Sequence, residues 1–398
     1  MCCQASYIGA MHTTTLISHR ALRTTVISIG IALIVSALAQ SPPSAIAIPV
    51  VKPTSGPWNS GAGFGFDLGK KKTLKTRQSV SGMACNLNAQ QQRICLIAFD
   101  EGVQARYAVI SDQRLAPDPE ALLLRVATAD VELDAEGMAT DGRYFYVTGS
   151  HSAKRSDCAS NPESRHVIRF RLDPVTGRAM RSPAANPVGG WVDYADTTRL
   201  WRIMQAQPAL AAYVGERKCL GSEPPPKAPS LTGQQGVNVE GLAVQGGSLY
   251  FGFRGPVSAG VEGEGGVAKV LAVDADALFT DGEPRATVTH IALGAHRGIR
   301  DMVAVKNGLL LLAGPDDNAT NKSVGWTLAW WDGKSSGQTV VPKVLAALDL
   351  SGVKLRGCDE ELKPEAITVL RETPEAYQLL VLSDGMCDGG PLAFTIAR

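Results

Sequence analysis

Polar and charged side chains open five similar short segments of this chain. In each segment the opening residue precedes a small or acidic residue and then a short, mostly apolar pair. The segments are Ser81-Gly82-Met83-Ala84, Glu136-Gly137-Met138-Ala139, Glu240-Gly241-Leu242-Ala243, Arg300-Asp301-Met302-Val303 and Glu365-Ala366-Ile367-Thr368. A turn and a hydrophobic, strand-like run follow each segment. In a structural repeat, the residue that opens each unit is expected to recur at one place in space.

Acidic side chains gathered at one place repel each other, and a cation would offset that repulsion. Glu136, Glu240 and Glu365 open three of the units, and Asp384 follows the second strand of the last unit. Carboxylate oxygens are the ligands that calcium prefers. We therefore predict these four residues as a calcium site. Each glutamate could instead only accept hydrogen bonds from a neighbouring unit, since ion-pair networks also gather charges without chemistry.

Two arginines and a histidine complete the candidate chemistry. Arg300 opens the fourth unit, and Arg254 follows the second strand of the third unit. Both could pair with the acids, or they could hold the anionic group of a substrate. His151 lies in a Gly-Ser-His-Ser loop, and the titration range of histidine suits proton transfer. A lone histidine in a loop is, however, more often simply solvated.

The elements that would position these residues are short strands. A strand–turn–strand unit repeated at this size predicts an all-β fold of the β-propeller type. The openers lie 55 to 65 residues apart, except that the second and third are 104 apart. We predict five blades, with six as the alternative. The long interval is interpreted as a helical insertion over residues 175–235, with a helix over Asp196–Val214 that could cap one face.

The last unit offers only three strands before the chain ends. We expect Phe64–Leu68 to supply the missing strand, because closure by an N-terminal strand removes exposed sheet edges. Thr73–Val80 is a further candidate strand. On this interpretation the propeller domain spans residues 64–398.

The N-terminal region resembles an export signal. Arg20 and Arg23 precede the apolar run Val26–Leu38, and Ala37-Leu38-Ala39 offers a small-residue cleavage site. We predict a signal peptide over residues 1–39 and a flexible lead-in over residues 40–63. The apolar run is short for a membrane span, so an uncleaved anchor is the alternative. We expect a periplasmic or secreted protein with no membrane span in the mature chain.

Cysteine usage is consistent with export. Six cysteines follow the predicted signal, and an even number in an exported chain indicates disulfides. Six cysteines allow 15 pairings, and none of the spacings is Cys-x-x-Cys, which disfavours a metal or redox role. Order along the chain favours the pairs Cys85–Cys95, Cys158–Cys219 and Cys358–Cys387.

The overall charge excludes some classes of partner. A formal net charge of +1 gives no electrostatic case for binding nucleic acid or an anionic membrane surface. The chain is 44% hydrophobic, which is enough for a substantial core. We expect a monomer whose partner is a small anionic molecule or an unknown periplasmic protein.

Several motifs occur in the order seen in one known group of proteins. They are Glu136-Gly137-Met138-Ala139-Thr140-Asp141-Gly142, Asn238-Val239-Glu240-Gly241-Leu242-Ala243 and Gly298-Ile299-Arg300-Asp301-Met302, together with the insertion. Over roughly residues 80–398 the chain resembles a secreted bacterial β-propeller family of uncharacterised function. More distantly it resembles the esterase-like phytases. Calcium-dependent gluconolactonase and paraoxonase propellers are a weaker analogy, because they use asparagines at the metal and only Asn238 lies near an opener here. The resemblance implies fold and export, and it does not imply an activity.

Two functional hypotheses follow from the residues. The first is a calcium-assisted hydrolase of phosphate esters or related small esters at the central channel mouth. The second is a non-enzymatic periplasmic propeller that binds a ligand or a protein, with the charged mouth acting as an ion-paired plug.

Overall fold

A computed structural model describes residues 47–66, 68–126, 132–182, 188–259, 265–334 and 339–398. The predicted signal peptide, with its candidate cleavage site at Ala37-Leu38-Ala39, and the beginning of the lead-in lie outside the described residues. Within the described residues, we find no helix with the length and apolar character that crossing a bilayer requires.

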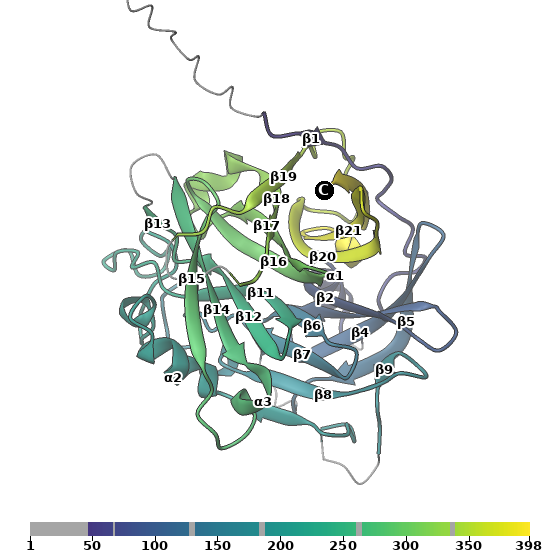
Figure 1. The fold of residues 1–398 in the computed structure, drawn as a ribbon, viewed down its shortest axis with the longest axis horizontal. Coiled ribbons are helices and arrows are strands. Elements are labelled where there is room, and N and C mark those ends of the chain that lie inside the picture. Colours follow the sequence, from purple (N-terminus) through teal and green to yellow (C-terminus); the bar gives the residue numbers. More distant parts are fainter. Residues whose placement is uncertain (1–46, 67, 127–131, 183–187, 260–264, 335–338) are drawn as a thin grey trace, which may run out of the picture. The chain divides into compact units, whose positions relative to one another are not determined.

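The described chain folds into five antiparallel sheets, which are the five blades of a β-propeller (Figure 1). Blade one contains β2 (Val80–Leu87), β3 (Arg93–Phe99), β4 (Gln104–Ser111) and β5 (Arg114–Leu123). Blade two contains β6 (Ala135–Thr140), β7 (Tyr144–Gly149), β8 (Val167–Asp173), β9 (Arg178–Ala179) and β10 (Ala195–Thr197). Blade three contains β11 (Asn238–Gln245), β12 (Ser248–Gly255), β13 (Ser258–Ala259), β14 (Gly266–Asp274) and β15 (Ala286–Ala292).

The last two blades follow the same pattern. Blade four contains β16 (Arg297–Val305), β17 (Gly308–Pro315), β18 (Trp326–Trp331) and β19 (Lys343–Leu348), with β1 (Val50–Val51) parallel to β19. Blade five contains β20 (Lys363–Glu372), β21 (Ala376–Asp384) and β22 (Leu392–Ala397). The first strand of each blade contacts the first strand of the next, and β20 contacts β2, which closes the ring. The prediction of five blades is therefore confirmed, and the alternative of six is wrong.

Each blade has a register shift at the residue that opens its repeat. The pairing of the first two strands passes from Ala135 to Gly137 in blade two and leaves Glu136 without a partner residue. Ser81, Glu240, Arg300 and Glu365 are skipped in the same way. A bulge of this kind re-aims the side chain of the extra residue. The repeated opener is therefore a repeated bulge, and it turns one polar side chain per blade out of the regular alternation.

The glycine after the opener allows neighbouring blades to approach closely. A Cβ atom on Gly82 would lie 2.2 Å from the carbonyl oxygen of Glu136, and one on Gly137 would lie 2.7 Å from that of Glu240. In blade four the equivalent residue is Asp301. Its carboxylate accepts backbone hydrogen bonds from Met302 and from Ile367 of blade five, both at 2.7 Å. The backbone contact is thus replaced by a side-chain bridge between blades.

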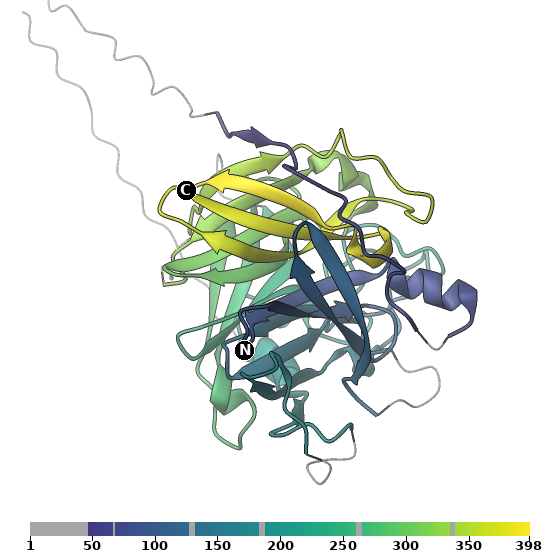
Figure 2. The same ribbon diagram turned by 90° about the vertical axis from the view of Figure 1, so that its right-hand side faces the viewer.

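The N-terminal segment closes blade five at a different place from the one predicted. Phe64 to Phe66 form no strand, and α1 (Lys70–Arg77) occupies most of the second candidate strand, so both strand predictions are wrong. Phe64 instead packs edge-on against Phe99, with ring centroids 5.4 Å apart. The edge of β22 is instead hydrogen-bonded to a segment that precedes Phe64 in the sequence: the Thr54 N–H donates to the Ala393 carbonyl at 2.7 Å. Figure 2 shows this segment beside the yellow strands of blade five, leading to α1.

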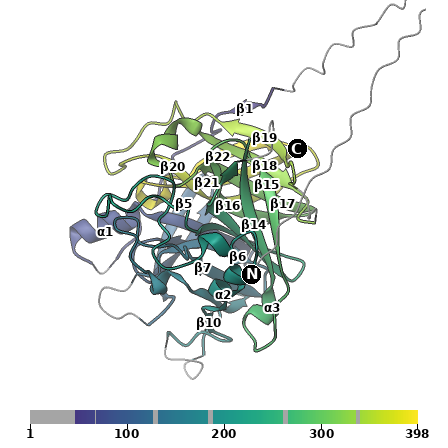
Figure 3. The same ribbon diagram turned by 90° about the vertical axis from the view of Figure 1, so that its left-hand side faces the viewer.

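The insertion is helical in its middle part only. The expected helix is shorter than predicted: α2 (Arg199–Ala206) is followed by a 3₁₀ turn at Ala211–Tyr213. Leu200, Met204 and Leu210 are buried in a core shared with blades two and three, while β9 and β10 from the same region add to blade two. Arg199 donates to the Ala277 carbonyl of α3 (Ala275–Leu278) at 2.7 Å, so the two helices lie together (Figure 3).

The three favoured disulfides are confirmed. Their Cα–Cα distances are 4.0 Å for Cys85–Cys95, 4.9 Å for Cys158–Cys219 and 6.0 Å for Cys358–Cys387. The first links directly opposed residues of β2 and β3. The other two disulfides link loops that are distant in sequence. Both lie at the end of the propeller where the openers are found.

The remaining 3₁₀ turns are Pro162–Ser164, Ala319–Val324 and Cys387–Gly389.

Candidate functional site

A cavity of about 1010 Å³ lies where the first strands of the blades begin and the second strands end. Six of the seven predicted site residues line it: Glu136, Glu240, Arg254, Arg300, Glu365 and Asp384. The bulged openers of blades two to five contribute four of these side chains. The structure therefore brings together residues that are up to 248 positions apart (136 to 384) in the sequence.

Carboxylates outnumber cationic side chains in this cavity by eleven to six. The carboxylates are Asp100, Glu132, Asp134, Glu136, Glu163, Glu240, Asp316, Asp317, Glu361, Glu365 and Asp384. The cationic side chains are Lys154, Arg155, Arg254, Arg300, Lys322 and Lys363. The charged side chains of the cavity form two parts with different electrostatics, one built around two arginines and the other without cationic partners.

In the first part, Arg300 lies between two of the opener glutamates. Its side chain is 2% exposed, and its Nε atom is 2.9 Å from Oε2 of Glu240. The N–H bond is not directed at that oxygen, so the contact is an ion pair rather than a hydrogen bond. Nη2 donates to Oε1 of Glu365, and Nη1 donates to the Pro315 carbonyl at 3.3 Å. Burial, with the charge of Arg254, lowers the pKa of Arg300 to about 10, which leaves it protonated at neutral pH.

Arg254 joins the same network from the end of β12. Nη1 donates to Oε1 of Glu240 at 2.8 Å, and Nε is 3.2 Å from Oδ1 of Asp317. Asn238 donates to the same two carboxylates at 3.0 and 3.2 Å. Burial lowers the pKa of Arg254, but the charges of Glu240 and Asp317 outweigh it and raise the pKa above its usual value. We call Asn238, Glu240, Arg254, Arg300, Asp317 and Glu365 the arginine network.

The second part of the cavity contains acids without matching cations. We call Asp100, Asp134 and Glu136 the acidic cluster. Burial raises the pKa of Glu136 well above its usual value, and the charges of Glu240 and Asp134 raise it further. Burial, and then the charge of Asp384, likewise raise the pKa of Asp100 well above its usual value. Burial also raises the pKa of Asp134, although a hydrogen bond from Ser150 opposes the shift.

Two carboxyl groups of the acidic cluster stand out among the described residues. The Glu136 carboxylate has neither a hydrogen bond nor an ion pair to any described residue. Oδ1 of Asp100 is buried without a hydrogen-bond partner in the described part of the chain. A buried acceptor without a donor is costly, so Oδ1 of Asp100 favours an incoming cation or proton, and the half-buried Glu136 carboxylate is free to bind the same cation.

Asp384 lines the cavity beside the acidic cluster but has a cationic partner. Nζ of Lys363 is 3.0 Å from Oδ2 of Asp384 and also pairs with Glu361. Oδ1 of Asp384 accepts a hydrogen bond from the Gly385 N–H at 2.8 Å. Burial lowers the pKa of Lys363, but Asp384 and Glu361 outweigh it and the pKa is raised.

His151 is the predicted site residue that the structure does not bring to the cavity. Its side chain is fully buried, and its backbone N–H donates to the Ser164 carbonyl at 3.1 Å. Burial lowers the pKa of His151 to about 3, so the ring is neutral at physiological pH. Neither ring nitrogen has a hydrogen-bond partner among the described residues.

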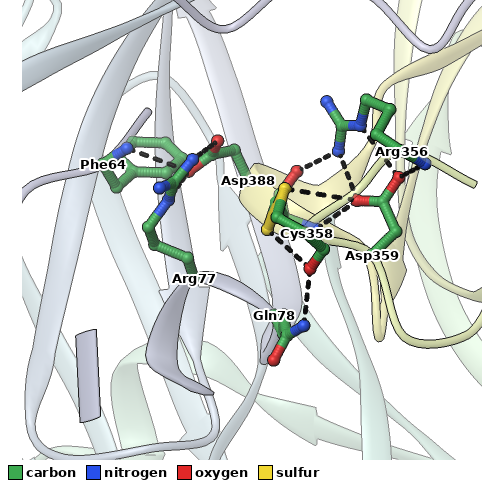
Figure 4. Close-up of a disulfide and its surroundings, with 8 residues drawn as sticks. Phe64, Arg77, Gln78, Arg356, Cys358, Asp359 and Asp388 are labelled. Carbon is green, nitrogen blue, oxygen red and sulfur yellow. Dashed lines mark hydrogen bonds and ion pairs between the residues drawn. A yellow bond between two sulfur atoms is a disulfide. The ribbon is translucent and has the colours of Figure 1, made fainter. Parts of the chain in front are cut away.

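The predicted calcium ligands do not form a closed coordination sphere as they stand. Among the described residues, no three cavity carboxylates place oxygen atoms within 4.8 Å of one another. The one group that meets this spacing in the described chain is Cys358, Asp359 and Cys387. Its two cysteines are joined as a disulfide, and Asp359 accepts from Arg356 at 2.8 Å (Figure 4). Disulfide sulfurs are not thiolate ligands, so this group is a structural staple.

Asp100, Asp134 and Asp317 were not among the predicted site residues, although the structure places all three in the cavity. A signal for one of them was present, because the position two residues before the opener is also polar in several units. Asp134, Asn238 and Lys363 hold that position in blades two, three and five. The first strands begin at the cavity, so a polar residue two positions before an opener also lies near it.

Comparisons with known proteins give a family and a set of distant structural likenesses. The chain is similar to a β-1,3-galactosidase of family GH43 solved with galactodeoxynojirimycin (10% identity, TM-score 0.40, covering 80% of this chain and 91% of that one). It is also similar to an endo-arabinase from Bacteroides thetaiotaomicron (10% identity, TM-score 0.37, 80% and 95% covered). A third likeness is to the calcium-binding protein regucalcin from Agrobacterium tumefaciens (9% identity, TM-score 0.35, 88% and 96% covered).

No curated protein matches this sequence. The family described as protein of unknown function (DUF3616) matches residues 87–185 and 193–388, which include all five openers except Ser81. Because these two segments make up most of the chain, the protein belongs to the DUF3616 family of unknown function.

Proposed function

We propose that this protein is a calcium-assisted hydrolase that cleaves a phosphate ester or a related small ester in the central cavity. One observation carries the proposal: the acidic cluster faces a cavity of about 1010 Å³ without cationic partners, while the acids of the arginine network beside it are ion-paired. A site with this imbalance favours a divalent cation, and a bound cation would then favour an anionic substrate.

The chemistry of the donors fits calcium. The unpaired groups are all carboxylates, the hard oxygen ligands that calcium takes, and Asp100 contributes a buried oxygen without a partner. Glu136 and Asp384 are the two predicted ligands that Arg300 does not engage. We propose that Asp100, Glu136 and Asp384 hold the ion, with water completing its coordination. Their oxygens lie too far apart to share an ion as they stand, so binding requires these side chains to move toward one another. Glu240 and Glu365, which we also predicted as ligands, are paired with Arg300, and the proposal assigns them to the arginine network.

A bound calcium ion would supply Lewis-acid polarisation of a phosphoryl or carbonyl oxygen. The chain's own residues would bind the substrate and position the carboxylates around it. Arg254 lines the cavity with 18% of its side chain exposed. We therefore propose that it binds the anionic group of the substrate. Arg300 is 2% exposed and fixes Glu240 and Glu365, which makes it a positioning residue. The role predicted for His151 has no support from its burial, and the proposal does not use it.

The experiment compares hydrolysis of a panel of phosphate monoesters and lactones in calcium and in EDTA. Glu136→Gln removes one proposed ligand, and Glu163→Gln is the matched control. Glu163 lines the same cavity but pairs with Arg125 at 2.6 Å, with 44% of its side chain exposed. We expect turnover that requires calcium, is lost in Glu136→Gln and persists in Glu163→Gln. Turnover that is equal in EDTA would refute the calcium role.

The ion pairs favour one second candidate. Glu240, Arg300 and Glu365 form a buried row across the cavity, and such a row could serve as a plug beneath a bound ligand or protein partner. On this alternative the protein is a non-enzymatic binding propeller of the periplasm. It predicts no turnover of any panel substrate, whether calcium is present or removed.

We also propose a location, a first set of probes and an oligomeric state for the protein. Three disulfides are typical of proteins outside the cytoplasm, which supports a periplasmic or secreted location. The resemblance to esterase-like phytases motivates phosphate esters as first probes. A monomeric state stays a prediction, for which the measurement is the molar mass in solution by light scattering.

A further inference from the structure

A second cavity, of about 520 Å³, lies beside blade three. It shares Asp316, Asp317 and Asn318 with the first cavity, so the two are neighbours. The loop between β12 and β13 and the start of β14 form much of its wall. Among its lining residues is Ser258, a half-buried serine that the proposed calcium site does not use.

Ser258 lies next to a buried lysine. In the pairing of β13 with β14, Ser258 is opposite Val267, and Lys269 is two residues further along β14 on the same face of the sheet. Nζ of Lys269 is 2.6 Å from Oγ of Ser258 and 3.4 Å from the Pro256 carbonyl. The short strand pairing thus places Ser258, which lines the cavity, within hydrogen-bond distance of a buried amine.

The surroundings of Lys269 disfavour its charged form relative to an exposed lysine. The residue is 2% exposed, and within the described ranges no carboxylate lies within ion-pair distance of Nζ. A buried ammonium without a counter-charge is strongly disfavoured. The titratable groups that face Lys269 are Tyr213, whose ring centroid is 5.3 Å from Nζ, and His290, its partner on β15. Burial lowers the pKa of Lys269 to about 8, so a substantial fraction is an amine at slightly alkaline pH.

We propose that Ser258 is a nucleophile activated by Lys269, which makes the second cavity a separate acyl-transfer site for small carboxylic esters. Oγ of Ser258 attacks the ester carbonyl carbon while its proton passes to Nζ of Lys269. The carbon–oxygen bond of the ester then breaks, and Lys269 returns the proton to the departing alcohol. Water attacks the acyl-serine in a second step, again with Lys269 as the base, and releases the acid and the free serine. Paired serine and lysine residues serve in this way on unrelated folds.

The test uses a fluorophosphonate probe on the full mature chain, with the labelled residue located by peptide mass spectrometry. The serine oxygen displaces fluoride from phosphorus, so the reaction reports nucleophilicity without requiring the natural ester. The variants are Ser258→Ala and Lys269→Met, which keeps the apolar stem of the lysine. Ser222→Ala is the matched control, because Ser222 lines the same cavity but its Oγ accepts from Asn318 at 2.8 Å.

We expect labelling at residue 258, loss of that labelling in Ser258→Ala, and no change in Ser222→Ala. Loss of a general base lowers the rate by about 100-fold or more, so Lys269→Met should label at least about 100-fold more slowly. If Lys269→Met does not fold, the pH profile of the unmodified chain decides instead. Since the base must be unprotonated, the rate should rise as pH increases through about 8. Labelling at another residue, an equal rate in a folded Lys269→Met, or a rate that is flat between pH 7 and 9 would overturn the proposal. EDTA should leave the labelling unchanged, which separates this site from the calcium site.

Discussion

Arg300 and Glu240, which open adjacent blades, form an ion pair with only 2% and 3% of their side chains exposed. Each is the bulged residue of its first strand, skipped by the strand pairing. The same arginine reaches Glu365, the bulged residue of the next blade. A single guanidinium therefore joins three consecutive blades at the site of the repeat, because its planar group can face two carboxylates at once.

Removal of Arg300 should strongly destabilise the fold. Arg300→Met leaves Glu240 and Glu365 buried without their shared cation, and breaking a buried ion pair costs about 3–5 kcal/mol. Arg300→Lys should recover only part of this loss, because an ammonium cannot match the fork of the guanidinium. The measurement is the free energy of unfolding in urea.

The control for that series is Arg181→Ala. Arg181 pairs with Glu120 on the surface with 50% of its side chain exposed, and its guanidinium lies 4.3 Å from the centroid of the Trp191 ring. Its loss should therefore change the free energy of unfolding by about 1 kcal/mol or less. Equal effects of Arg300→Met and Arg181→Ala would contradict the role assigned to the arginine network.

Glu136 should give the metal-free protein a pH-dependent instability. Its pKa in the folded chain is raised above 4.5, first by burial and then by Glu240 and Asp134. A carboxyl group of this kind binds more protons when folded, so its favourable contribution is present below about pH 4.5 and is lost as pH rises through the folded pKa. In EDTA, Glu136→Gln should flatten that decline and unfold at a higher temperature than the unmodified chain at pH 7. Glu163→Gln is the control, and a lower midpoint for Glu136→Gln than for this control would refute the assignment.

Gly137, which follows the opener of blade two, should not tolerate a side chain. In Gly137→Ala the new Cβ would lie 2.6 Å from Cβ of Leu242 and 2.7 Å from the Glu240 carbonyl oxygen. Both atoms belong to the next blade, so the blades would have to separate, at a cost of about 1–3 kcal/mol. Gly352→Ala is the matched control, because no atom lies within 4 Å of its Cβ, and we expect little change. Thermal unfolding of the two variants measures the difference, and equal midpoints would contradict the close approach.

The sequence was sufficient for the blade count because the opener motif is tied to a backbone feature. Glu136 and Glu240 are recognisable in the sequence since each occupies a bulge and precedes a glycine that the next blade requires. The disulfide pairs followed from order along the chain for a related reason, since each links neighbouring parts of one or two units.

Other features depend on contacts that one sequence does not display. Phe64 was expected in a strand, but its side chain packs against Phe99 and its N–H donates to Asp388 at 2.9 Å. The lysine-rich segment at Lys70–Arg77 is helical, in keeping with the propensity of long straight side chains. His151 was assigned chemistry from its residue type, whereas only the packing of its loop decides that it is buried. The division of the acids between the arginine network and the acidic cluster likewise depends on which side chains meet across blades.

The central claim is that the acidic cluster binds calcium, and thermal unfolding of the purified mature chain tests it most directly. A ligand that binds only the folded state raises the unfolding midpoint as its concentration increases. We predict a midpoint that rises with calcium concentration, returns to its starting value in EDTA, and no longer responds to calcium in Glu136→Gln. A midpoint that is the same in calcium and in EDTA would contradict the account, and it would leave the arginine network as the feature that defines the cavity.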